Sequence, residues 1–536
     1  MTANHMHELL ARQARVWSQI CFMTEGLAIA PAVHSLIRHG MIDKLKAAPT
    51  AAALLGLGGN AGFVAVAVRA LVQQGRLSNN GGVPDGALAV ENRIWLQQAS
   101  DYSQVPGLLD VCGKLMGNEV PGGNRENAGE ALRRWLFGIP VDAIPDRVTT
   151  ELLGFLAAPV LLGLVDAGSI PPFQPAPCPL EDAKPTDPAG VLGYMALRCL
   201  GWIDGPATAP ALTIEGRMAS VFAGQLRYPL SYLPMLARMD DLLFGDPRAA
   251  TRRADDGTES HLDRAADIRF STEVFARSCA PALLAIALPL FHRDRGPGRP
   301  AVIVDVGCGE ANLLATLFDA IRDNPDTADA ASDLVLVGVE NNPVAERAAR
   351  QTLTKSGAKF VVIGGDVSRP DAIARDLAAQ GIDFTNVLHV NKSVIHDREL
   401  VDDRLGTAGL AQADFANLTD GAFARPDGTR VDAETVQDDL VRFFQRWRPY
   451  LARHGMIALE PHGLTTTLAP MLAGRSLTAA MEALHGFSCQ YLTTAEHFAC
   501  AAARSGLTIF QQRMIGSSLT GHDHMSCSHL GAHPAS

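Results

Sequence analysis

A short glycine turn in the middle of the chain carries the residue types and spacing of a cofactor site. The segment Ala301 to Val306 is a continuous apolar run, typical of a strand buried on both faces of a parallel sheet. It leads into Asp305-Val-Gly-Cys-Gly309, and apolar residues then recur at helical spacing from Leu313 to Ile321. Gly307 and Gly309 have no Cβ, so the backbone can turn sharply and a ligand can lie directly against it. The sequence therefore predicts a cofactor-binding turn at the carboxyl end of this strand.

Two classes of cofactor use such a turn, and the third position after Gly309 separates them. A dinucleotide loop has the pattern G-x-G-x-x-G, in which the last glycine allows the helix to pack closely around a pyrophosphate. This chain has Asn312 at that position. The segment instead resembles motif I of class I S-adenosylmethionine (SAM) methyltransferases, whose cofactor has no phosphate. The resemblance implies an α/β fold with a Rossmann-like domain built on a mostly parallel seven-stranded sheet.

Later strands end in polar groups at the spacing that a nucleoside pocket requires. The strand Leu334 to Glu340 ends in a carboxylate that we predict to accept from the ribose hydroxyls, with a solvated strand-end acid as the alternative. The strand Lys359 to Asp366 ends in an acid that resembles the methyltransferase residue accepting from the adenine amino group. A fourth strand spans Phe384 to Asn391. The predicted cofactor-binding residues are Asp305, Gly307, Cys308, Gly309, Glu340, Asn341, Asp366, Val367 and His389.

The composition is that of a globular protein with room for two or three domains. Of the 536 residues, 47% are hydrophobic and 19% are charged, and the net charge is -11. Nucleic-acid backbones are bound by clustered Lys and Arg, so this charge argues against nucleic acid as a partner. The chain has no uninterrupted apolar run of membrane-spanning length and its start does not resemble a signal peptide, so we expect a cytoplasmic protein with no membrane partner. Nine cysteines without a C-x-x-C pair favour reduced thiols.

Composition also divides the chain into three expected regions. Residues 1–165 are expected to be helical and winged-helix-like, with an amphipathic helix from Asn60 to a glycine at Gly75. This helix has one Arg and no Lys, so dimerisation or a lid role is favoured over DNA binding, and we expect a homodimer through this region. Residues 166–265 begin with a linker that contains seven prolines and continue as a helical lid. Residues 266–536 are the expected SAM-binding domain.

Four longer sequence segments indicate a narrower group within the methyltransferases. They are the segments Asn60 to Gly75, Leu388 to Arg398, Gly455 to His462 and His485 to Tyr491. Together they resemble the methyltransferase domains of polyketide starter-unit loading modules, of the type found in the apratoxin and saxitoxin pathways. The resemblance covers residues 20–80 and 270–515. It implies an enzyme of specialised metabolism that methylates a small or carrier-protein-bound acyl substrate.

The resemblance also implies the chemistry of the acceptor side. Carbon methylation passes through an enolate, which a mononuclear divalent metal such as Mn, Fe or Zn stabilises. His485 and Gln490 match the family's metal-ligand phrase, and His462 is a further candidate ligand, although ordinary hydrogen bonding is the alternative for His485 and Gln490. Four predicted catalytic residues follow the fourth and fifth strands, which places them at the edge of the sheet that carries the glycine turn. They are His396, Asp397, Glu460 and His462, with a helix cap as the alternative role for the first two.

Other features are compatible with more than one methyl acceptor. Cys489 stands where the family has an acid, so S-methylation of methionine or a related thioether acid is the alternative function. A thioether is already nucleophilic and needs only alignment with the methyl group. A SAM-sensing winged-helix regulator is a more remote alternative. The insertion Val401 to Asp439 is expected to close over the substrate. The tail Gly521 to His529 is rich in His but small and polar, so we expect disorder or adventitious metal binding there.

Overall fold

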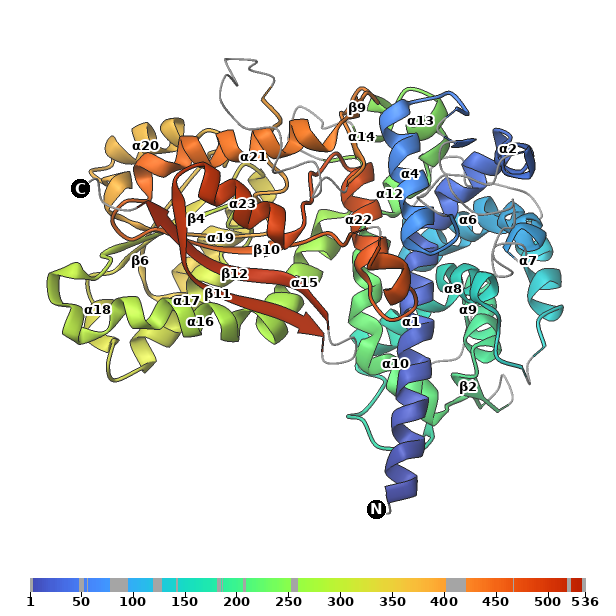
Figure 1. The fold of residues 1–536 in the computed structure, drawn as a ribbon. Coiled ribbons are helices and arrows are strands. Elements are labelled where there is room, and N and C mark those ends of the chain that lie inside the picture. The colour runs from blue at the N-terminus through green and yellow to red at the C-terminus, as the bar shows by residue number, and fades with distance from the viewer. Residues whose placement is uncertain are drawn as a thin grey trace.

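The apolar runs predicted as strands form the middle of a seven-stranded sheet in the computed structural model of the chain (Figure 1). The structure describes residues 3–532 except 48–52, 55, 78–94, 119–127, 141–142, 181–184, 186, 206–208, 252–258, 402–420, 466 and 518–521. The sheet order is β11-β12-β10-β7-β4-β5-β6. Its strands are β4 (Val302–Val306), β5 (Val335–Val339), β6 (Lys359–Ile363), β7 (Leu388–Lys392), β10 (Met456–Pro461), β11 (Leu507–Ser517) and β12 (His522–Ala532).

Five of these strands are parallel, and the last two close the sheet as an antiparallel hairpin. β4 pairs in parallel with both β5 and β7, which places the carboxyl ends of these strands at one edge. β12 pairs antiparallel with β10 on one side and with β11 on the other. This arrangement confirms the predicted α/β fold with a mostly parallel seven-stranded sheet. The strands that follow β4 in the sequence lie on both of its sides in the sheet, with β5 and β6 on one side and β7 on the other. Open α/β sheets bind ligands at such a switch point.

Helices cover both faces of the sheet because successive side chains of each strand point to opposite sides. Ile303 packs into the core on one face, and its neighbours Val304 and Val306 pack into the other. The first face is covered by α16 (Ala280–Ala287), α17 (Asn312–Asp323) and α19 (Pro343–Ser356). The second is covered by α20 (Pro370–Ala378), α21 (Ala433–Trp447) and α23 (Ala495–Arg504).

The first half of the chain forms a separate helical body beside the α/β body (Figure 1). Its central element is the 36-residue helix α1 (Ala3–Arg38), which packs against α8 (Arg147–Asp166). A three-stranded sheet of two-residue strands, β1 (Cys178–Pro179), β2 (Ile203–Asp204) and β3 (Ala211–Leu212), lies within it. The other long helices are α2 (Met41–Ala47), α4 (Ala61–Gln73), α6 (Val105–Met116), α7 (Ala128–Phe137), α9 (Pro188–Cys199) and α10 (Ile214–Phe222). Short helices follow as α11 (Arg227–Ser231), α12 (Leu233–Leu236), α13 (Met239–Phe244) and α14 (Arg248–Thr251).

Residues 1–165 and 166–265 do not form separate packing units as the composition suggested. One hydrophobic core runs from Val16 to Leu262 and includes side chains from both regions. The proline-rich segment therefore crosses the surface of one body rather than joining two. The wing expected after α4 would begin in residues 78–94, and the insertion Val401 to Asp439, expected to close over the substrate, includes residues 402–420. Both of these stretches lie outside the described residues.

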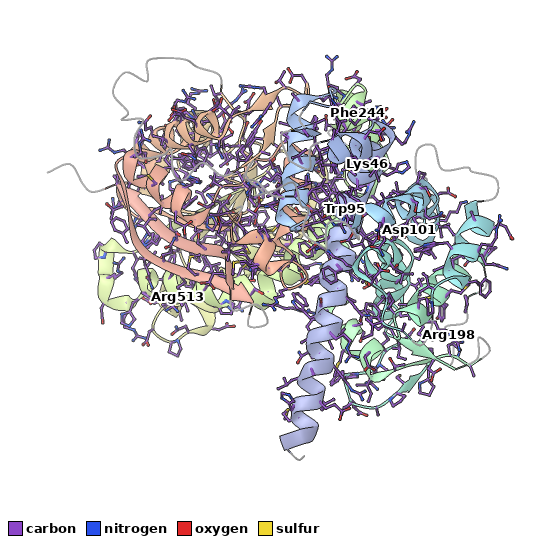
Figure 2. The ribbon with its side chains drawn as sticks, turned by 45° about the vertical axis from the view of Figure 1, so that its right-hand side comes forward. Lys46, Trp95, Asp101, Arg198, Phe244 and Arg513 are labelled. Atoms are coloured by element: carbon purple, nitrogen blue, oxygen red, sulfur yellow. The ribbon has the colours of Figure 1, made fainter. Side chains whose placement is uncertain are left out.

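A buried ionic network ties the helical body together. Arg76, just after α4, donates to both carboxylate oxygens of Glu151 on α8 at 2.7 Å each. The guanidinium lies 5.1 Å from the ring centre of Trp95, which Figure 2 labels within the helical body. Arg147 donates to Glu25 of α1 at 2.8 Å. A buried charge that loses its partner costs several kcal/mol, so this network fixes how α1, α4 and α8 are placed.

The His-containing tail is a strand of the sheet, which contradicts the expectation of disorder. Residues 522–532 form β12, and Ser526, Cys527 and Ser528 are fully buried between β10 and β11. The strand is stable because both of its edges are hydrogen-bonded and its small side chains fit between the covering helices. Among the described tail residues, Nε2 of His529 donates to the His454 carbonyl oxygen at 2.8 Å.

Within the part of the chain that the structure describes, three helical segments are long and apolar enough, by length and composition, to cross a membrane. They are Met6–Arg38, Arg147–Asp166 and Arg264–Phe291. The apolar windows of the first two are 83% and 78% buried inside the protein, whereas that of the third is 39% buried. The third segment comprises α15 (Arg264–Val274), a π-helical turn (Phe275–Cys279) and α16, and part of it faces the cavity described next.

Candidate active site

A cavity of about 920 Å³ lies at the carboxyl ends of the parallel strands, between the α/β body and the helical body. The strand ends supply one wall, including the loops after β4, β5, β6 and β7. The helical body supplies the opposite wall through α1, α10 and α11, and α15 and α22 (Thr478–Phe487) complete it. The π-helical turn at Phe275–Cys279 also lines the cavity, and such turns occur frequently at functional sites.

The glycine turn after β4 has the backbone that only glycine adopts without strain. Gly307 has φ +76° and Gly309 has φ +54°. A Cβ added to Gly307 would lie 2.8 Å from Cγ2 of Val394, so the backbone and the loop after β7 touch closely there. A Cβ on Gly309 would meet nothing within 4 Å, because that position faces open space. Both glycines line the cavity, as the sequence predicted.

The two predicted nucleoside carboxylates are fixed by backbone N–H groups. Glu340 accepts from the Gly309 amide through Oε2 and from the Asn342 amide through Oε1, each at 2.9 Å. Asp366 accepts from the Ser368 amide at 2.8 Å. Each carboxylate oxygen keeps a lone pair for a ligand. The structure thus brings eight of the nine predicted cofactor residues to one wall of the cavity, namely Asp305, Gly307, Cys308, Gly309, Glu340, Asn341, Asp366 and Val367.

His389 is the exception, because it does not line the cavity. Its ring is fully buried, and Nε2 lies 3.1 Å from the carbonyl oxygen of Phe384 and 3.2 Å from that of Tyr450. The ring packs against Phe384 and Trp447. His389 lies near the start of β7, whereas the cavity opens at the end of that strand. Burial lowers the pKa of His389 to about 4, so it is a neutral core residue.

Asp305 and Lys392 are two neighbouring titratable groups in the cavity wall. Asp305 Oδ1 has no hydrogen-bond partner among the described residues. Burial and the nearby Glu340 carboxylate raise the pKa of Asp305 to about 8, against the opposing effect of Lys392. Lys392 Nζ donates to Ser271 Oγ of α15 at 2.6 Å, and burial lowers its pKa. Lys392 ends β7 just as Glu340 follows β5, so the strand-end rule that selected Glu340 could also have selected it.

A histidine and a glutamate form a hydrogen-bonded pair at the acceptor end of the cavity. Glu460 Oε1 accepts from Nδ1 of His396 at 2.7 Å and from the His396 backbone amide at 2.9 Å. Both side chains are 4% exposed. Because the carboxylate accepts from Nδ1, that nitrogen carries the proton and the lone pair is on Nε2. His396 lines the cavity, so the pair has the arrangement of a general base with an orienting carboxylate.

The other predicted acceptor-side residues lie close to this pair, with one exception. The His485 ring centre is 4.7 Å from that of His396, and Gln490 is hydrogen-bonded to Asp397. These residues line the cavity. His462 does not, because its Nε2 is bonded to Ser526 Oγ at 2.8 Å and its ring packs against Phe498. The structure therefore does not place the predicted catalytic residue His462 in the cavity wall.

The predicted metal set does not fit a metal ion. His462 points into the core between β12 and α23, away from His485 and Gln490. Nδ1 of His485 is 2.6 Å from the carbonyl oxygen of Met481, so that nitrogen carries the proton and the lone pair of the neutral ring is on Nε2. In the described part of the chain, no group of three or more His, Cys, Asp or Glu side chains is placed to hold a metal. We derive no step through one.

Fold and site together define a class I SAM-dependent methyltransferase, with a glycine turn and two strand-end carboxylates at the switch point of a seven-stranded sheet. Residues 259–516 match the family model described as the AprA MT2-like domain, so this part of the chain is similar to that family. A comparison with curated proteins found no match.

Solved structures of methyltransferases are similar to the chain at low identity. The mitomycin 7-O-methyltransferase MmcR has 16% identity and a TM-score of 0.39, over 76% of this chain and all 100% of that one. Human N-acetylserotonin methyltransferase in complex with SAM has 12% identity and a TM-score of 0.39, over 77% and 99%. The CurJ carbon methyltransferase has 10% identity and a TM-score of 0.33, over 75% and 98%. At these values the likeness carries no argument about the acceptor.

Proposed function

We propose that this enzyme methylates an acidic carbon next to a carbonyl group in a small or carrier-bound acyl substrate of natural-product biosynthesis. The observation that supports this is the 2.7 Å bond between His396 and Glu460 at the wall of the cavity that holds the glycine turn. A base is required when the acceptor must lose a proton before it becomes nucleophilic. A thioether acceptor has no such need, so the pair favours carbon over sulfur.

In this proposal, one group of residues binds the cofactor and another group activates the acceptor. Glu340 and Asp366 are placed to bind the ribose hydroxyls and the adenine amino group, and Gly307 and Gly309 allow the cofactor to approach the backbone. SAM, when bound, supplies an electrophilic methyl group. His396 Nε2 removes the α-proton of the acceptor while Glu460 holds the Nδ1–H and stabilises the positive charge that develops on the ring. The carbon then attacks the methyl group in line with its bond to sulfur.

The experiment that tests this proposal uses SAM labelled in the methyl group. The enzyme is incubated with malonyl and methylmalonyl groups on a carrier protein, with the corresponding free acids and with methionine, and products are analysed by mass spectrometry. We expect label on the α-carbon of an acyl substrate. We also expect the wild-type enzyme to exchange the α-hydrogen of that substrate with solvent deuterium. Labelled methionine sulfonium, with no labelled acyl product, would overturn the proposal.

Asp305 should make SAM binding depend on pH. Its pKa of about 8 means that the free enzyme holds a proton there below that pH. A bound sulfonium cation favours the carboxylate, so binding releases this proton and the affinity rises with pH, by up to about tenfold per unit, until it levels off near pH 8. Calorimetry in buffers of different ionisation enthalpy measures the proton release. Asp305→Asn should remove both the release and the pH dependence below 8, whereas an unchanged slope in that variant would assign the titration to another group.

A further inference from the structure

A tyrosine from the helical body reaches the acceptor end of the cavity. Tyr228 lies on α11, which precedes the segment matched by the family model, yet its side chain lines the cavity. Its hydroxyl oxygen is 3.0 Å from Nδ1 and 3.4 Å from Nε2 of His485. Its ring stacks on Phe270 at 5.0 Å and meets Tyr232 edge-on at 5.4 Å. These contacts fix the position of the hydroxyl group in the cavity wall.

The hydrogen bonds of this pair leave Tyr228 able to donate. The Met481 carbonyl can only accept, so Nδ1 of His485 carries the ring hydrogen and donates it there at 2.6 Å, with the Tyr228 oxygen 3.0 Å from the same nitrogen. The Tyr228 hydroxyl is also bonded to that of Tyr232. This bond raises the pKa of Tyr228 and lowers that of Tyr232, so Tyr228 is its donor, and a bound carbonyl oxygen would take the Tyr228 hydrogen in place of Tyr232.

Both members of the pair are neutral in the range in which enzymes work. Burial has the largest effect on Tyr228, and with the nearby Asp267 and Asp397 carboxylates it raises the pKa of Tyr228 well above its usual value. Burial and, to a smaller extent, the neighbouring His396 together lower the pKa of His485 to about 3. A neutral hydroxyl that donates a hydrogen bond stabilises a developing oxyanion without binding a ground-state anion tightly. Asp267, which is ion-paired with Arg264 at 3.0 Å, and Asp397 are charged groups near this pair.

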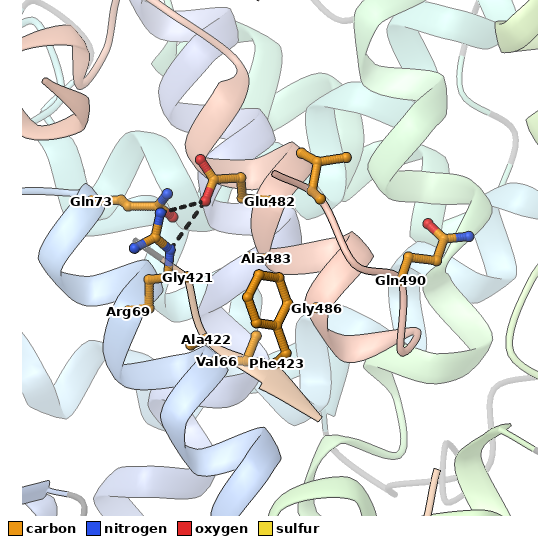
Figure 3. A pocket seen from close by; sticks show the side chains of 11 residues that line it. Val66, Arg69, Gln73, Gly421, Ala422, Phe423, Glu482, Ala483, Gly486 and Gln490 are labelled. Carbon is orange, nitrogen blue, oxygen red and sulfur yellow. Dashed lines mark hydrogen bonds and ion pairs between the residues drawn. The ribbon is translucent and has the colours of Figure 1, made fainter. Parts of the chain in front are cut away.

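Helix α22 presents His485 from the same side as Tyr228. Arg69 of α4 donates to Glu482 of α22 through Nε at 3.1 Å and Nη2 at 3.0 Å, as the dashed lines in Figure 3 show. A Cβ on Gly486 would lie 2.7 Å from Val66 of α4, so the two helices touch closely. The buried apolar side chains of α22 belong to the core of the helical body. His485 and Tyr228 are thus held by one body, and His396 and Glu460 by the other.

We propose that Tyr228, supported by His485, is the catalytic hydrogen-bond donor to the carbonyl oxygen of the acceptor, and that the helical body thereby selects carbonyl compounds. The inference rests on the proposed function. When His396 takes the α-proton, the electron pair of the broken C–H bond moves onto the oxygen, where the Tyr228 hydroxyl stabilises it and keeps its own proton. The pair then returns to form the carbon–methyl bond, the methyl–sulfur bond breaks with its electrons on sulfur, and His396 loses its proton to water.

Tyr228→Phe tests this role because it keeps the ring and removes only the donor. We expect kcat to fall about 100-fold, as for the loss of one oxyanion donor. The rate of α-hydrogen exchange without SAM should fall in parallel, whereas SAM affinity by calorimetry should stay at the wild-type value. Tyr450→Phe is the matched control, because Tyr450 bonds to Asp371 outside the cavity. Wild-type kcat and exchange in Tyr228→Phe would overturn the inference.

His485→Phe is the second variant and removes both ring nitrogens. If the two residues act as one unit, the double variant should lose little more than either single variant, since effects within a unit are not additive. Fully additive losses would overturn the pairing. The experiment distinguishes failure of the proposed function from failure of this inference. If the wild-type enzyme shows neither α-hydrogen exchange nor carbon methylation, the proposed function is contradicted. If the wild type and Tyr228→Phe exchange the α-hydrogen at equal rates, only the role of Tyr228 is contradicted.

Discussion

Replacing His396 with alanine should lower kcat by about 10³-fold while SAM binds as tightly as before. Its ring is the cavity-lining group whose Nδ1 is held by Glu460, which leaves a lone pair on Nε2 for the acceptor proton. The variant removes the base but leaves the strand ends that bind the cofactor intact. Transfer of labelled methyl to the acyl acceptor gives kcat, solvent deuterium exchange at the α-carbon reports proton removal alone, and calorimetry gives the SAM affinity.

Two further variants separate the base from its surroundings. Glu460→Gln keeps the side-chain shape but loses the charge that stabilises the protonated ring, so we expect a smaller loss, on the order of 10²-fold. His292→Ala is the matched control, because His292 is 40% exposed and pairs with Asp294 on a surface turn. Retention of more than a tenth of the wild-type exchange rate in His396→Ala would move the base elsewhere, with Asp397 as the next candidate on the same wall.

The cofactor side of the site could be predicted because its signals are local. Strands buried in a parallel sheet are continuous apolar runs, so β4, β5 and β6 are visible in the sequence without knowledge of their neighbours. Their carboxyl ends share one edge of the sheet, which is sufficient to place Asp305, Glu340 and Asp366 together. The positive φ of Gly307 follows from the same turn.

The expectations that differ from the structure concern residues whose surroundings depend on contacts distant in the sequence. His389 lies at the start of β7, where Trp447 packs against its ring and the Tyr450 carbonyl lies beside it, and not at the end of the strand, where the cavity opens. The tail looked disordered because Ser526, Cys527 and Ser528 have little hydropathy, and only pairing with both β10 and β11 buries them. The same pairing holds His462 through Ser526 and so removes it from the predicted metal set.

Tyr228 illustrates what no local pattern could show. It precedes His485 by 257 residues and belongs to another body, and no motif surrounds it in the sequence. Its role depends on α22 packing against α4 through Arg69 and Glu482, an ion pair 413 residues apart in the chain. In the proposed mechanism, recognition of the methyl acceptor therefore depends on the contact between the two bodies. Binding of the methyl donor depends on one stretch of the α/β body.

Gly307→Arg should abolish measurable SAM binding, a loss of at least about 100-fold in affinity. Any side chain at its φ of +76° costs about 1–2 kcal/mol in backbone strain, and a Cβ there would lie 2.8 Å from Val394. The rest of the arginine would occupy the cavity wall on which the cofactor lies. Calorimetric titration with SAM measures the loss, and α-hydrogen exchange without SAM shows whether the acceptor end is still assembled.

The comparison with Gly381→Arg separates the ligand effect from the backbone effect. Gly381 has φ +78°, a Cβ there would meet nothing within 4 Å, and the residue lies after α20, outside the cavity. This variant therefore carries the same backbone strain and the same added charge, and SAM should bind to it as to the wild type. Equal loss of affinity in both variants would mean that strain alone disrupts the fold. Retained affinity in Gly307→Arg would place the cofactor away from the glycine turn, because an arginine and the cofactor cannot occupy the same wall of the cavity.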